Sequence, residues 1–374
     1  MLKVLHIISD TNLGGAGQHV LTFLEHYDRS RLAVRVLCPP GALLVKHCAA
    51  AGVEVDTSPF FAGDSSFGWR GLAGLVREVG GLIKQHGIDV VHTHATFSGR
   101  LAARLAGVPG VVYTKHRMDW AAPGGELKSR AAAFLNRATC HRVIAVSRAV
   151  RESLVREGMP EEKIALIYNG IDVEKFRERA GRELSPPLPE VRGKRVVGMV
   201  ARLEPEKGHR HFLDAAALVL ERRGDAVFVV AGTGSLAGAL EKKAHRLGIS
   251  DRVFFTGFRE DIPQLIAALD VMVHPSLTEA FGISLVEGMC LGRPCVASAV
   301  GGLAEIAGTD GYAALLVPPG DAAALAGRII FLLENPDAAR AMGRRAAEMV
   351  RQKFDAGTMT EEITGLYYQI VDRA

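Results

Sequence analysis

The sequence has few cysteines, few aromatic residues and no long apolar run, and each shortage excludes a class of protein. Its five cysteines are odd in number and include no C-x-x-C pair, which indicates reduced thiols that serve as small apolar side chains. Aromatic residues make up 6% of the chain, and no basic stretch is interleaved with them, so a stacking platform for nucleic acid is not expected. No run reaches the roughly 18 apolar residues of a membrane span. The opening MLKVLHIISD lacks the features of a signal peptide, so we expect a cytoplasmic protein.

Charge is nearly balanced over the whole chain but differs between its halves. The net charge is +4; residues 1–184 hold 24 Lys and Arg against 18 Asp and Glu, and the remainder hold 21 against 23. Two interpretations of this asymmetry stay open: a solvated helix face, which is the simpler one, or peripheral contact with an anionic membrane surface or a phosphate-bearing acceptor. The densest basic stretch contains Lys128, Arg130, Arg137, His141 and Arg142.

The chain is long enough for two α/β domains. Its 374 residues, 48% of them hydrophobic, exceed the roughly 250 to 300 residues at which a single core stops growing. Short runs rich in Val and Ile alternate with helical patterns, which predicts two doubly wound parallel sheets covered by helices on both faces. The predicted strands are residues 4–8, 34–38, 89–94, 111–114, 143–146, 196–200, 227–232, 252–257, 270–275, 295–298 and 314–319.

A proline-rich stretch separates the two halves. RELSPPLPEVRGK, residues 182–194, has neither helical nor strand periodicity, so it predicts an interdomain connection. We therefore place a first domain at 1–184 and a second at 185–355. Residues 358–371 carry apolar side chains at helical spacing and predict an amphipathic terminal helix, although periodicity does not say which domain it covers.

The stretch LTEAFGISLVEG, residues 277–288, places two carboxylates around a predicted helix start. Ligands of doubly wound domains bind beyond the carboxyl ends of the strands, and this stretch follows such a strand. The helix is expected to begin near Gly282, where the free amides of Ile283 and Ser284 would bind an anion. Glu279 precedes this anion site, and Glu287 could accept hydrogen bonds from ligand hydroxyls; taken singly, each acid could instead be a dipole partner or a solvated residue. The inward stripe is Leu285, Val286, Met289 and Cys290.

A second loop offers two cations. VVGMVARLEPEKGHRHF, residues 196–212, leads from a strand to Arg202 and Lys207, which would neutralise a pyrophosphate and the charge that develops when it leaves. The alternative is a surface loop with solvated cations. No D-x-D triplet occurs in the chain, so we expect that no divalent metal is required.

Histidines at a predicted strand end allow a further interpretation. His92 and His94 share a strand face and, with His116 and Asp119, could form a metal site. We favour this less, because carboxylates are sparse nearby and the spacing fits no common zinc pattern; His92 is better explained as a packed core histidine. His116, together with the neighbouring Lys115 and Arg117, is assigned speculatively to the acceptor side.

The segment VVAGTGSLAG fits the dinucleotide fingerprint G-x-G-x-x-A through Gly232, Gly234 and Ala237. A lone fingerprint is a weak signal, and this one falls in the second strand–helix unit of its half. Dinucleotide binding is therefore an outside alternative.

The motifs resemble glycosyltransferase family 4, whose members are retaining enzymes of the GT-B fold. "ARLEPEKG", "EAFGISLVEGMCLGRPCVAS" and "VGGLAEI" are similar to its donor-site motifs, and "LGGAGQHV" and "DVVHTHATFSGRLAARLAG" to its N-terminal segments. The resemblance extends over almost the entire chain. It implies two Rossmann-like domains that face each other across a cleft, with the donor on the second domain and the acceptor on the first. It also implies that residues 356–374 cross back to the first domain.

The resemblance also implies roles for individual residues. Arg202 and Lys207 would contact the donor diphosphate, Glu287 the ribose, and Glu279 the sugar hydroxyls, while His94 would lie near the reacting sugar. With His94, Arg202 and Lys207, Glu279 is assigned to the catalytic group, although its chemical role is not settled. Further donor-binding residues are Gly15, Gly17, Gly232, Gly234, Phe281, Gly282, Ile283 and Ser284.

The function implied is transfer of a hexose-type sugar from a nucleotide-diphosphate sugar, a UDP-sugar in preference to GDP or ADP, to a glycan or glycolipid hydroxyl. Retention by double displacement would need a placed carboxylate, and the acids of the N-terminal loops, Asp10, Asp119 and Glu126, occur in no motif that gives them this role. The resemblance instead implies same-face substitution, in which the leaving diphosphate accepts the proton of the acceptor hydroxyl. Two alternatives remain: an epimerase or hydrolase on the same scaffold, and a non-catalytic sugar-nucleotide sensor.

Overall fold

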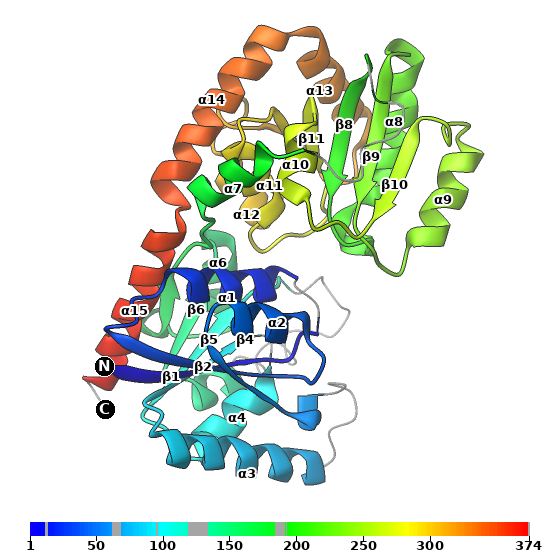
Figure 1. The fold of residues 1–374 in the computed structure, drawn as a ribbon. Helices are drawn as coiled ribbons and strands as arrows, with labels where there is room; N and C mark the ends of the chain where they lie inside the picture. The colour runs from blue at the N-terminus through cyan, green and yellow to red at the C-terminus, as the bar shows by residue number, and fades with distance from the viewer. Residues whose placement is uncertain are drawn as a thin grey trace. The chain divides into compact units, whose positions relative to one another are not determined.

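The protein forms two compact units. The computed structural model describes residues 1–11, 14–61, 69–94, 96–118, 134–183, 191 and 193–372. Unit 1 comprises Met1–Gly170 and Ala356–Ala374, and unit 2 comprises Ile171–Asp355. Each unit is built around one parallel sheet with helices packed on it (Figure 1). The predicted α/β class with two parallel sheets is confirmed.

Unit 1 has a seven-stranded sheet in the order β3-β2-β1-β4-β5-β6-β7, and every pairing is parallel. The strands are β1 (Leu2–Ile8), β2 (Leu32–Cys38), β3 (Glu54–Thr57), β4 (Val90–His94), β5 (Gly110–Lys115), β6 (Arg142–Ala145) and β7 (Ile164–Leu166). The helices are α1 (Gly15–His26), α2 (Leu43–Ala50), η1 (Pro59–Phe61), α3 (Trp69–His86), α4 (Phe97–Leu105), α6 (Arg148–Arg156), η2 (Glu161–Lys163) and α15 (Ala356–Val371). Helices α1 and α2 lie on one side of this sheet and α3 and α4 on the other (Figure 1), so the central strands are buried on both faces and read as continuous apolar runs.

Unit 2 has a six-stranded parallel sheet in the order β10-β9-β8-β11-β12-β13. The strands are β8 (Arg195–Val200), β9 (Ala226–Ala231), β10 (Val253–Gly257), β11 (Val271–His274), β12 (Cys295–Ser298) and β13 (Leu315–Val317). The helices are α7 (Val173–Ala180), η3 (Pro205–Lys207), α8 (His209–Arg222), α9 (Ala237–Arg246), α10 (Ile262–Ala267), α11 (Ile283–Cys290), α12 (Gly301–Ala307), α13 (Ala322–Glu334) and α14 (Pro336–Lys353).

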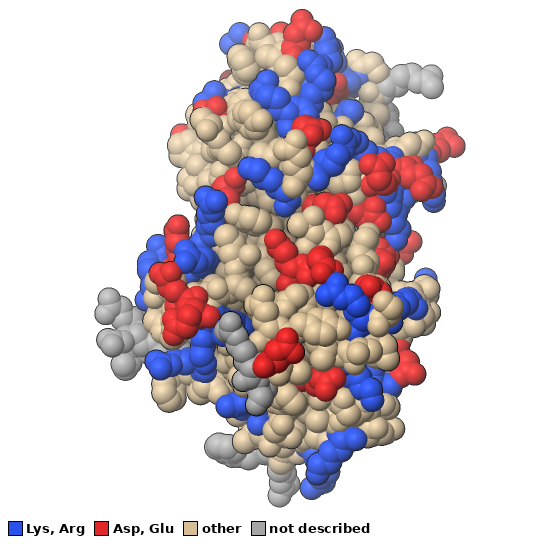
Figure 2. Space-filling model, turned by 90° about the vertical axis from the view of Figure 1, so that its left-hand side faces the viewer, with Lys and Arg blue, Asp and Glu red and all other residues tan. Residues whose placement is uncertain are grey.

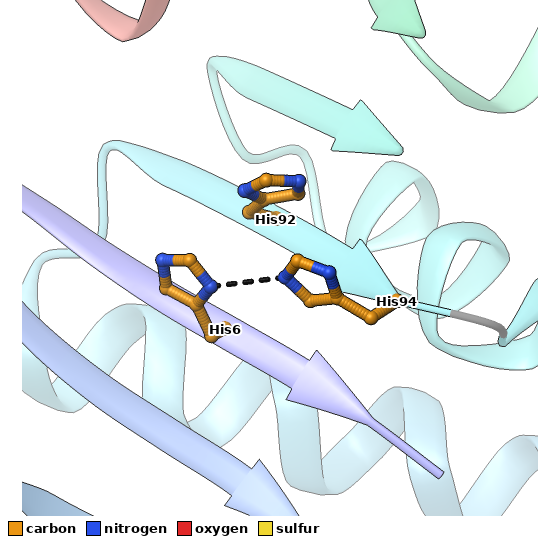
Figure 3. A group of neighbouring side chains, drawn as sticks. All are labelled: His6, His92 and His94. Carbon is orange, nitrogen blue, oxygen red and sulfur yellow. Dashed lines mark hydrogen bonds between the residues drawn. The ribbon is translucent and has the colours of Figure 1, made fainter. Parts of the chain in front are cut away.

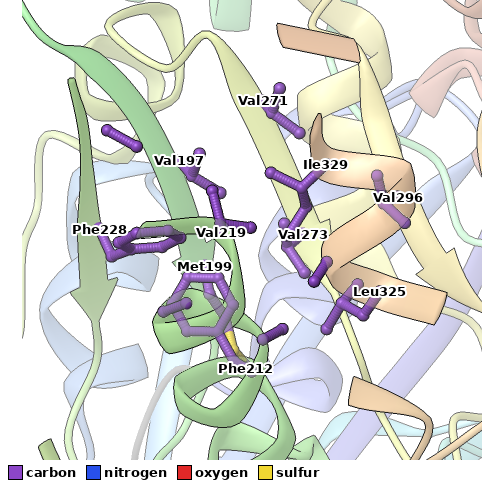
Figure 4. Close-up of a cluster of buried hydrophobic side chains, with 14 of the residues drawn as sticks. Val197, Met199, Phe212, Val219, Phe228, Val271, Val273, Val296, Leu325 and Ile329 are labelled. Atoms are coloured by element: carbon purple, nitrogen blue, oxygen red, sulfur yellow. The ribbon is translucent and has the colours of Figure 1, made fainter. Parts of the chain in front are cut away.

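The core of unit 2 lies between its sheet and helices α8 and α13. Figure 4 shows side chains of β8, β9, β11 and β12 meeting those of the two helices. Phe212 of α8 and Phe228 of β9 pack edge to face, with ring centroids 5.7 Å apart and both rings fully buried. This packing fixes α8, and therefore the loop that enters it from β8.

The terminal helix α15 completes the core of unit 1. Its buried residues are Ala356, Met359, Thr360, Ile363, Thr364, Leu366, Tyr367 and Ile370, and the apolar ones join strand and α1 residues in one cluster. The amphipathic pattern of residues 358–371 is therefore confirmed as a helix, and this helix belongs to unit 1.

The division between the units falls before α7, whereas the sequence analysis places it after residue 184. Helix α7 is held within unit 2, because Arg177 Nε donates to the carbonyl of Cys290 at 3.2 Å and Arg179 donates to that of Glu260 at 2.8 Å. Most of the predicted connection, residues 184–190 and 192, lies outside the described residues.

Strands β3 and β7 have no counterpart among the predicted strands, because β3 is polar and β7 spans only three residues. The other eleven strands coincide with predicted ones. All five cysteines are buried and free, as the sequence indicates. No helix in the described part of the chain is long and apolar enough to cross a membrane.

Candidate functional site

The predicted motif residues lie where the strand order of each sheet reverses. In unit 2 the reversal lies between β8 and β11, which are neighbours in the sheet, and in unit 1 between β1 and β4. Loops that leave such neighbouring strands in opposite directions open a crevice, which is where doubly wound domains bind ligands. The loop after β8 carries Arg202 and Lys207, the loop after β11 carries Glu279, and His94 ends β4.

Lys207 and Glu279 form one ion pair at this point. Lys207 Nζ lies 2.6 Å from Glu279 Oε2, and the two side chains are only 16% and 13% exposed. Burial alone would raise the pKa of the Glu279 carboxyl, but the Lys207 ammonium and the hydrogen bond from His274 outweigh it and lower that pKa to about 2. The carboxylate therefore stays ionised at neutral pH.

Two residues that the sequence analysis missed hold the Glu279 carboxylate. His274 Nε2 lies 3.0 Å from Oε2, and the hydroxyl of Ser276 donates to the same oxygen at 3.2 Å. The other ring nitrogen of His274 lies 3.1 Å from the hydroxyl of Ser284. A ring that donates from Nε2 to Glu279 can accept the Ser284 hydroxyl at Nδ1, so the two contacts of His274 are compatible with each other. The segment HPS, which begins at the last residue of a buried strand, was the available signal.

Helix α11 begins at the predicted anion site. Gly282 is its N-cap, with a φ of 107° and no side-chain cap, so the first amides of the helix keep their N–H groups free of intrahelical acceptors. Glycine is needed because this φ lies in the left-handed region. Phe281 is buried against Phe354 at 5.5 Å between ring centroids, which anchors the turn. The predicted inward stripe of α11 is buried, as expected.

Neighbouring loops lock the Glu279 loop in place. Leu277 N donates to the carbonyl of Glu206 at 2.8 Å, and Gly302 N donates to that of Glu279 at 3.0 Å. Gly208, with a φ of 75°, lies so close to the carbonyl of Pro275 that no side chain fits between them. The site is thus held by three loops before any ligand binds, which preorganises its charges.

Arg202 is the more exposed of the two cations. Its guanidinium donates to Glu206 at 3.2 Å, and its side chain is 55% exposed. Such an exposed pair is worth little, so Arg202 can exchange Glu206 for an anionic ligand. Lys207 by contrast is already committed to Glu279.

Glu287 lies on α11 and is half-buried. Burial raises the pKa of its carboxyl to about 7, against a weaker opposing effect of Arg179. Because ionising it in place is unfavourable, a ligand that donates hydroxyl hydrogens to it would be bound strongly.

The glycines of the dinucleotide-like fingerprint are explained by packing. Gly232, with a φ of 139°, and Gly234 lie against the backbone of Ala201 and Leu203, where a Cβ would clash. Leu203 N donates to the carbonyl of Thr233 at 2.9 Å. The two loops therefore pack backbone to backbone, so the fingerprint needs no dinucleotide to account for it.

In unit 1, His94 belongs to a buried histidine network. Its Nε2 lies 3.0 Å from Nδ1 of His6, as Figure 3 shows, and its Nδ1 lies 3.0 Å from Nε2 of His116. His92 bonds to Tyr367 and Thr114 and is fully buried, which confirms it as a core histidine. Both nitrogens of His94 are engaged, so ligand contact by its ring requires one of these bonds to be exchanged.

The first loop of unit 1 opens α1. Gly15 is its exposed first residue, and Gly17 is buried one turn within it. Donor contact by either glycine stays a prediction.

The cations assigned to the acceptor side behave differently from one another. Lys115 is buried, and its ammonium lies 2.6 Å from Glu157, so its charge is neutralised inside unit 1 and is not presented to a ligand. Burial of this strand-end residue against α6 explains the difference from the prediction. Arg117 is exposed, and His116 is half-buried. The acceptor role of both stays a prediction.

The basic stretch of the first half is only partly visible. His141 receives a hydrogen bond from Val111 N and lies 3.0 Å from a guanidinium nitrogen of Arg104, so it is engaged within the unit. On the face drawn in Figure 2, Lys and Arg are interspersed with Asp and Glu. The remaining predicted residues Asp119, Glu126, Lys128 and Arg130 lie outside the described residues.

Sequence comparison shows the family of the chain. The family model for glycosyl transferases group 1 matches residues 182–349, and that for glycosyltransferase family 4 matches residues 13–175. The chain is 34% identical over 233 residues to UDP-Gal:alpha-D-GlcNAc-diphosphoundecaprenol alpha-1,3-galactosyltransferase of Escherichia coli; the match spans 59% of this chain and 60% of that protein. It is 31% identical over 321 residues to 2-deoxystreptamine glucosyltransferase of Streptomyces kanamyceticus, which spans 76% and 78%.

Structural comparison agrees. The crystal structure of Anabaena HepE in complex with UDP-glucose has a TM-score of 0.83 and 26% sequence identity, and the superposition covers 99% of this chain and 100% of that one. The fold is that of the GT-B glycosyltransferases. With both halves matched in order and relatives aligned over most of their length, the chain is a glycosyltransferase that belongs to glycosyltransferase family 4.

Proposed function

We propose that this glycosyltransferase transfers a hexose-type sugar, with retention of anomeric configuration, from a nucleotide-diphosphate sugar to a hydroxyl acceptor. The observation that carries the proposal is the Lys207–Glu279 pair beside the uncapped start of α11, at the strand-order reversal of unit 2. Cation, helix amides and carboxylate are the groups that a diphosphate and a sugar need at neighbouring positions.

Leaving-group stabilisation is the main catalytic effect in this proposal. Lys207 and the exposed guanidinium of Arg202 neutralise the diphosphate as its bond to the sugar breaks, and the amides of Ile283 and Ser284 add to them. These cations and amides make a divalent metal unnecessary for this step. Because the loops are locked before binding, little reorganisation accompanies the reaction.

Glu279 acts as an anion and not as a proton donor. A pKa of about 2 leaves no acid form at neutral pH. Lys207, His274 and Ser276 all engage Oε2, so Oε1 faces the sugar hydroxyls and orients them. The proton of the acceptor hydroxyl then passes to the departing diphosphate on the same face, which gives retention.

Further contacts complete the donor site. Glu287 accepts hydrogen bonds from the ribose, and Gly232 and Gly234 border the nucleotide. The donor contacts predicted for Gly15, Gly17 and His94 of unit 1 belong to the same proposal. HepE of Anabaena is solved with UDP and with UDP-glucose, and the Escherichia coli relative is named for a UDP-galactose donor. These names support a UDP-sugar over a GDP- or ADP-sugar.

The donor is tested by thermal shift of the full chain against UDP-, GDP- and ADP-sugars, since a ligand that binds the folded state raises its melting temperature. We expect UDP-sugars to raise it most. Retention is tested by the anomeric configuration of the product in NMR; an inverted product rejects same-face substitution. Donor consumed equally without any acceptor would point to hydrolysis or epimerisation instead.

The acceptor class is a cell-surface glycan, lipopolysaccharide or glycolipid. The Escherichia coli relative is named for an acceptor on diphosphoundecaprenol, which supports a lipid-linked acceptor reached from the cytoplasmic face of the membrane. Co-sedimentation with vesicles of anionic lipid tests peripheral contact, with neutral vesicles as the control; equal recovery with both removes the electrostatic component.

A further inference from the structure

Three histidines of unit 1 converge from separate elements. His19 comes from α1, His94 from the end of β4, and His116 from the segment after β5. Their ring centroids are 4.9 to 5.5 Å apart. One ligand nitrogen from each ring lies within 4.8 Å of the other two. His19 and His94 are buried, and His116 is half-buried, which leaves a route from solvent.

One nitrogen of this group has no partner. His19 Nδ1 lies 2.8 Å from Oδ1 of Asn169, an oxygen that can only accept, so Nδ1 carries the hydrogen. His19 Nε2 is therefore a bare lone pair, and it is buried without a hydrogen-bond partner. Buried polar atoms of this kind are rare and mark a missing ligand or water. His94 Nδ1 and His116 Nε2, 3.0 Å apart, belong to the same group.

We propose that His19, His94 and His116 form a binding site for a borderline transition-metal dication such as Zn²⁺ or Co²⁺. Imidazole nitrogens are preferred ligands of these ions, and three of them leave a fourth position for water. The site lies in unit 1, and none of its three histidines is among the groups proposed to stabilise the leaving diphosphate.

The surrounding hydrogen bonds fit a metal on Nδ1 of His94. That nitrogen is then bare, and Nε2 of His94 donates to Nδ1 of His6. His6 Nε2 donates to the Tyr367 oxygen at 3.3 Å, and the Tyr367 hydroxyl donates to Nδ1 of His92 at 2.5 Å. His92 Nε2 then donates to Thr114 Oγ1 at 2.7 Å. Each group uses its single hydrogen once, as in the outer hydrogen bonds that orient histidine ligands.

A second histidine triad is less suitable. His6, His92 and His94 also bring ligand nitrogens within 4.8 Å, and Figure 3 shows their rings grouped over β1 and β4. Both nitrogens of His92 are already bonded, to Tyr367 and Thr114, and all three rings are fully buried. An ion there would have to displace a bonded partner of His92 and would have no open side, whereas at the proposed site it takes the place of the hydrogen between His94 Nδ1 and His116 Nε2.

The sequence analysis paired His92, His94 and His116 with Asp119. Asp119 lies outside the described residues. His19 replaces His92 in the proposed set, because a ligand nitrogen of His19 lies within 4.8 Å of those of His94 and His116, whereas His92 is grouped with His6 and His94.

The test uses the full chain after treatment with EDTA. Titration with Co²⁺ is followed by the visible d–d absorption of the bound ion, and competition by Zn²⁺ is followed by calorimetry. We expect one ion per chain with a low-coordinate cobalt spectrum. His19→Gln and His116→Gln should abolish the signal, and His47→Gln, at an exposed histidine of the same unit, should leave it unchanged. Circular dichroism checks that each variant is folded.

Two further variants test the ligand role of His116 and the orienting role of Asn169. His116→Cys should retain Zn²⁺ binding, because a thiolate also ligates zinc. Asn169→Ala should weaken binding about tenfold to a hundredfold, as expected when an outer partner is removed. Absence of binding to the parent, or unchanged binding in both glutamine variants, overturns the proposal. Loss in His92→Gln with retention in His19→Gln would assign the ion to the other triad and overturn it equally. None of these readouts depends on glycosyl transfer.

Discussion

The buried polar cluster of unit 1 and that of unit 2 occupy equivalent places in their sheets but are stabilised in opposite ways. In unit 1, burial lowers the pKa values of His6 and His19 to about 3 and about 4, so the rings are neutral and share hydrogens. In unit 2, Glu279 keeps its charge because a cation and two further donors reach the same oxygen. Burial favours the neutral form of histidines that have only other histidines beside them, whereas a buried carboxylate stays charged when a cation lies next to it.

The two clusters should therefore respond to acid in different pH ranges. A histidine whose folded pKa is lowered binds a proton more readily when unfolded, so its contribution to stability is lost as pH falls below about 6.5. A carboxyl whose folded pKa is lowered loses its contribution only as pH falls below about 4.5 toward about 2. Mild acid should thus weaken unit 1 before it affects the Lys207–Glu279 pair.

The largest effect is expected when Lys207, the cation of the buried polar cluster in unit 2, is replaced. Lys207→Ala should lower kcat about 100- to 1000-fold, because the charge on the leaving diphosphate is greatest in the transition state. Initial rates at saturating donor measure this. Lys243→Ala, at a lysine of unit 2 that is paired with Asp214 at 2.6 Å, is the matched control. Turnover within about twofold of the parent would exclude the leaving-group role.

The next effect is the loss of stability in acid that the buried histidine cluster of unit 1 should cause. Between pH 6.5 and 5.5, His6 and His19 together should remove about 2 kcal/mol from the stability of unit 1, roughly 1 kcal/mol per group, because an unfolded histidine goes from about half to about nine-tenths protonated over this range. Hydrogen exchange of β4 and β5 amides at the two pH values measures it. His19→Gln should show a smaller fall than the parent. An equal fall in both proteins would mean that His19 is not the titrating group.

Glu287 is an acid in unit 2 that behaves oppositely to Glu279. Because burial raises its folded pKa to about 7, its stabilising contribution is present below about 4.5 and is lost as pH rises through 7. Glu287→Gln should therefore stabilise unit 2 at pH 8 by on the order of 2 kcal/mol, while it raises the donor KM more than it lowers kcat.

Urea unfolding and donor titration measure the two changes in Glu287→Gln. Glu178→Gln, at a side chain that is 70% exposed, should change neither. A variant that loses kcat alone would contradict the ribose assignment.

The smallest effect tests the hydrogen bonds between Tyr367 of α15 and the buried histidine cluster of unit 1. Tyr367→Phe removes the hydroxyl that lies between His92 and His6, and it should destabilise unit 1 by about 1 to 2 kcal/mol because two buried nitrogens lose a partner. Thermal unfolding measures it. Tyr368→Phe, whose half-buried hydroxyl donates to the carbonyl of Arg31, should change stability less.

The parts of the fold that could be predicted are those that a pattern of neighbouring residues determines. Runs of Val and Ile identify the buried strands, and the loop after β11 has a spacing that predicts the start of α11 within one residue. Contacts between distant residues could not be predicted in this way. Lys207 and Glu279 are 72 positions apart, and each was given a separate ligand contact. Lys115 was assigned to the acceptor side because nothing local reveals Glu157, 42 positions away.

The histidine network also depends on contacts between residues that are distant in the sequence, which could not be predicted. The pattern His92-Thr93-His94 is visible in the sequence, but His6 and His19 enter the network only because β1 lies beside β4 and α1 packs on their sheet. Helix α7 was placed in the first domain because its contacts with α10 and α11 are likewise distant in the chain.

Helix α15 also decides the order in which the units can be finished on the ribosome. Unit 2 is one continuous segment, and all of it is made before α15. Unit 1 cannot complete its core until then, because Tyr367 and its neighbours close a core begun by Val4 and Ile8. Its strands must wait through the synthesis of the whole of unit 2, so the nascent chain carries an unfinished sheet that chaperones are suited to cover.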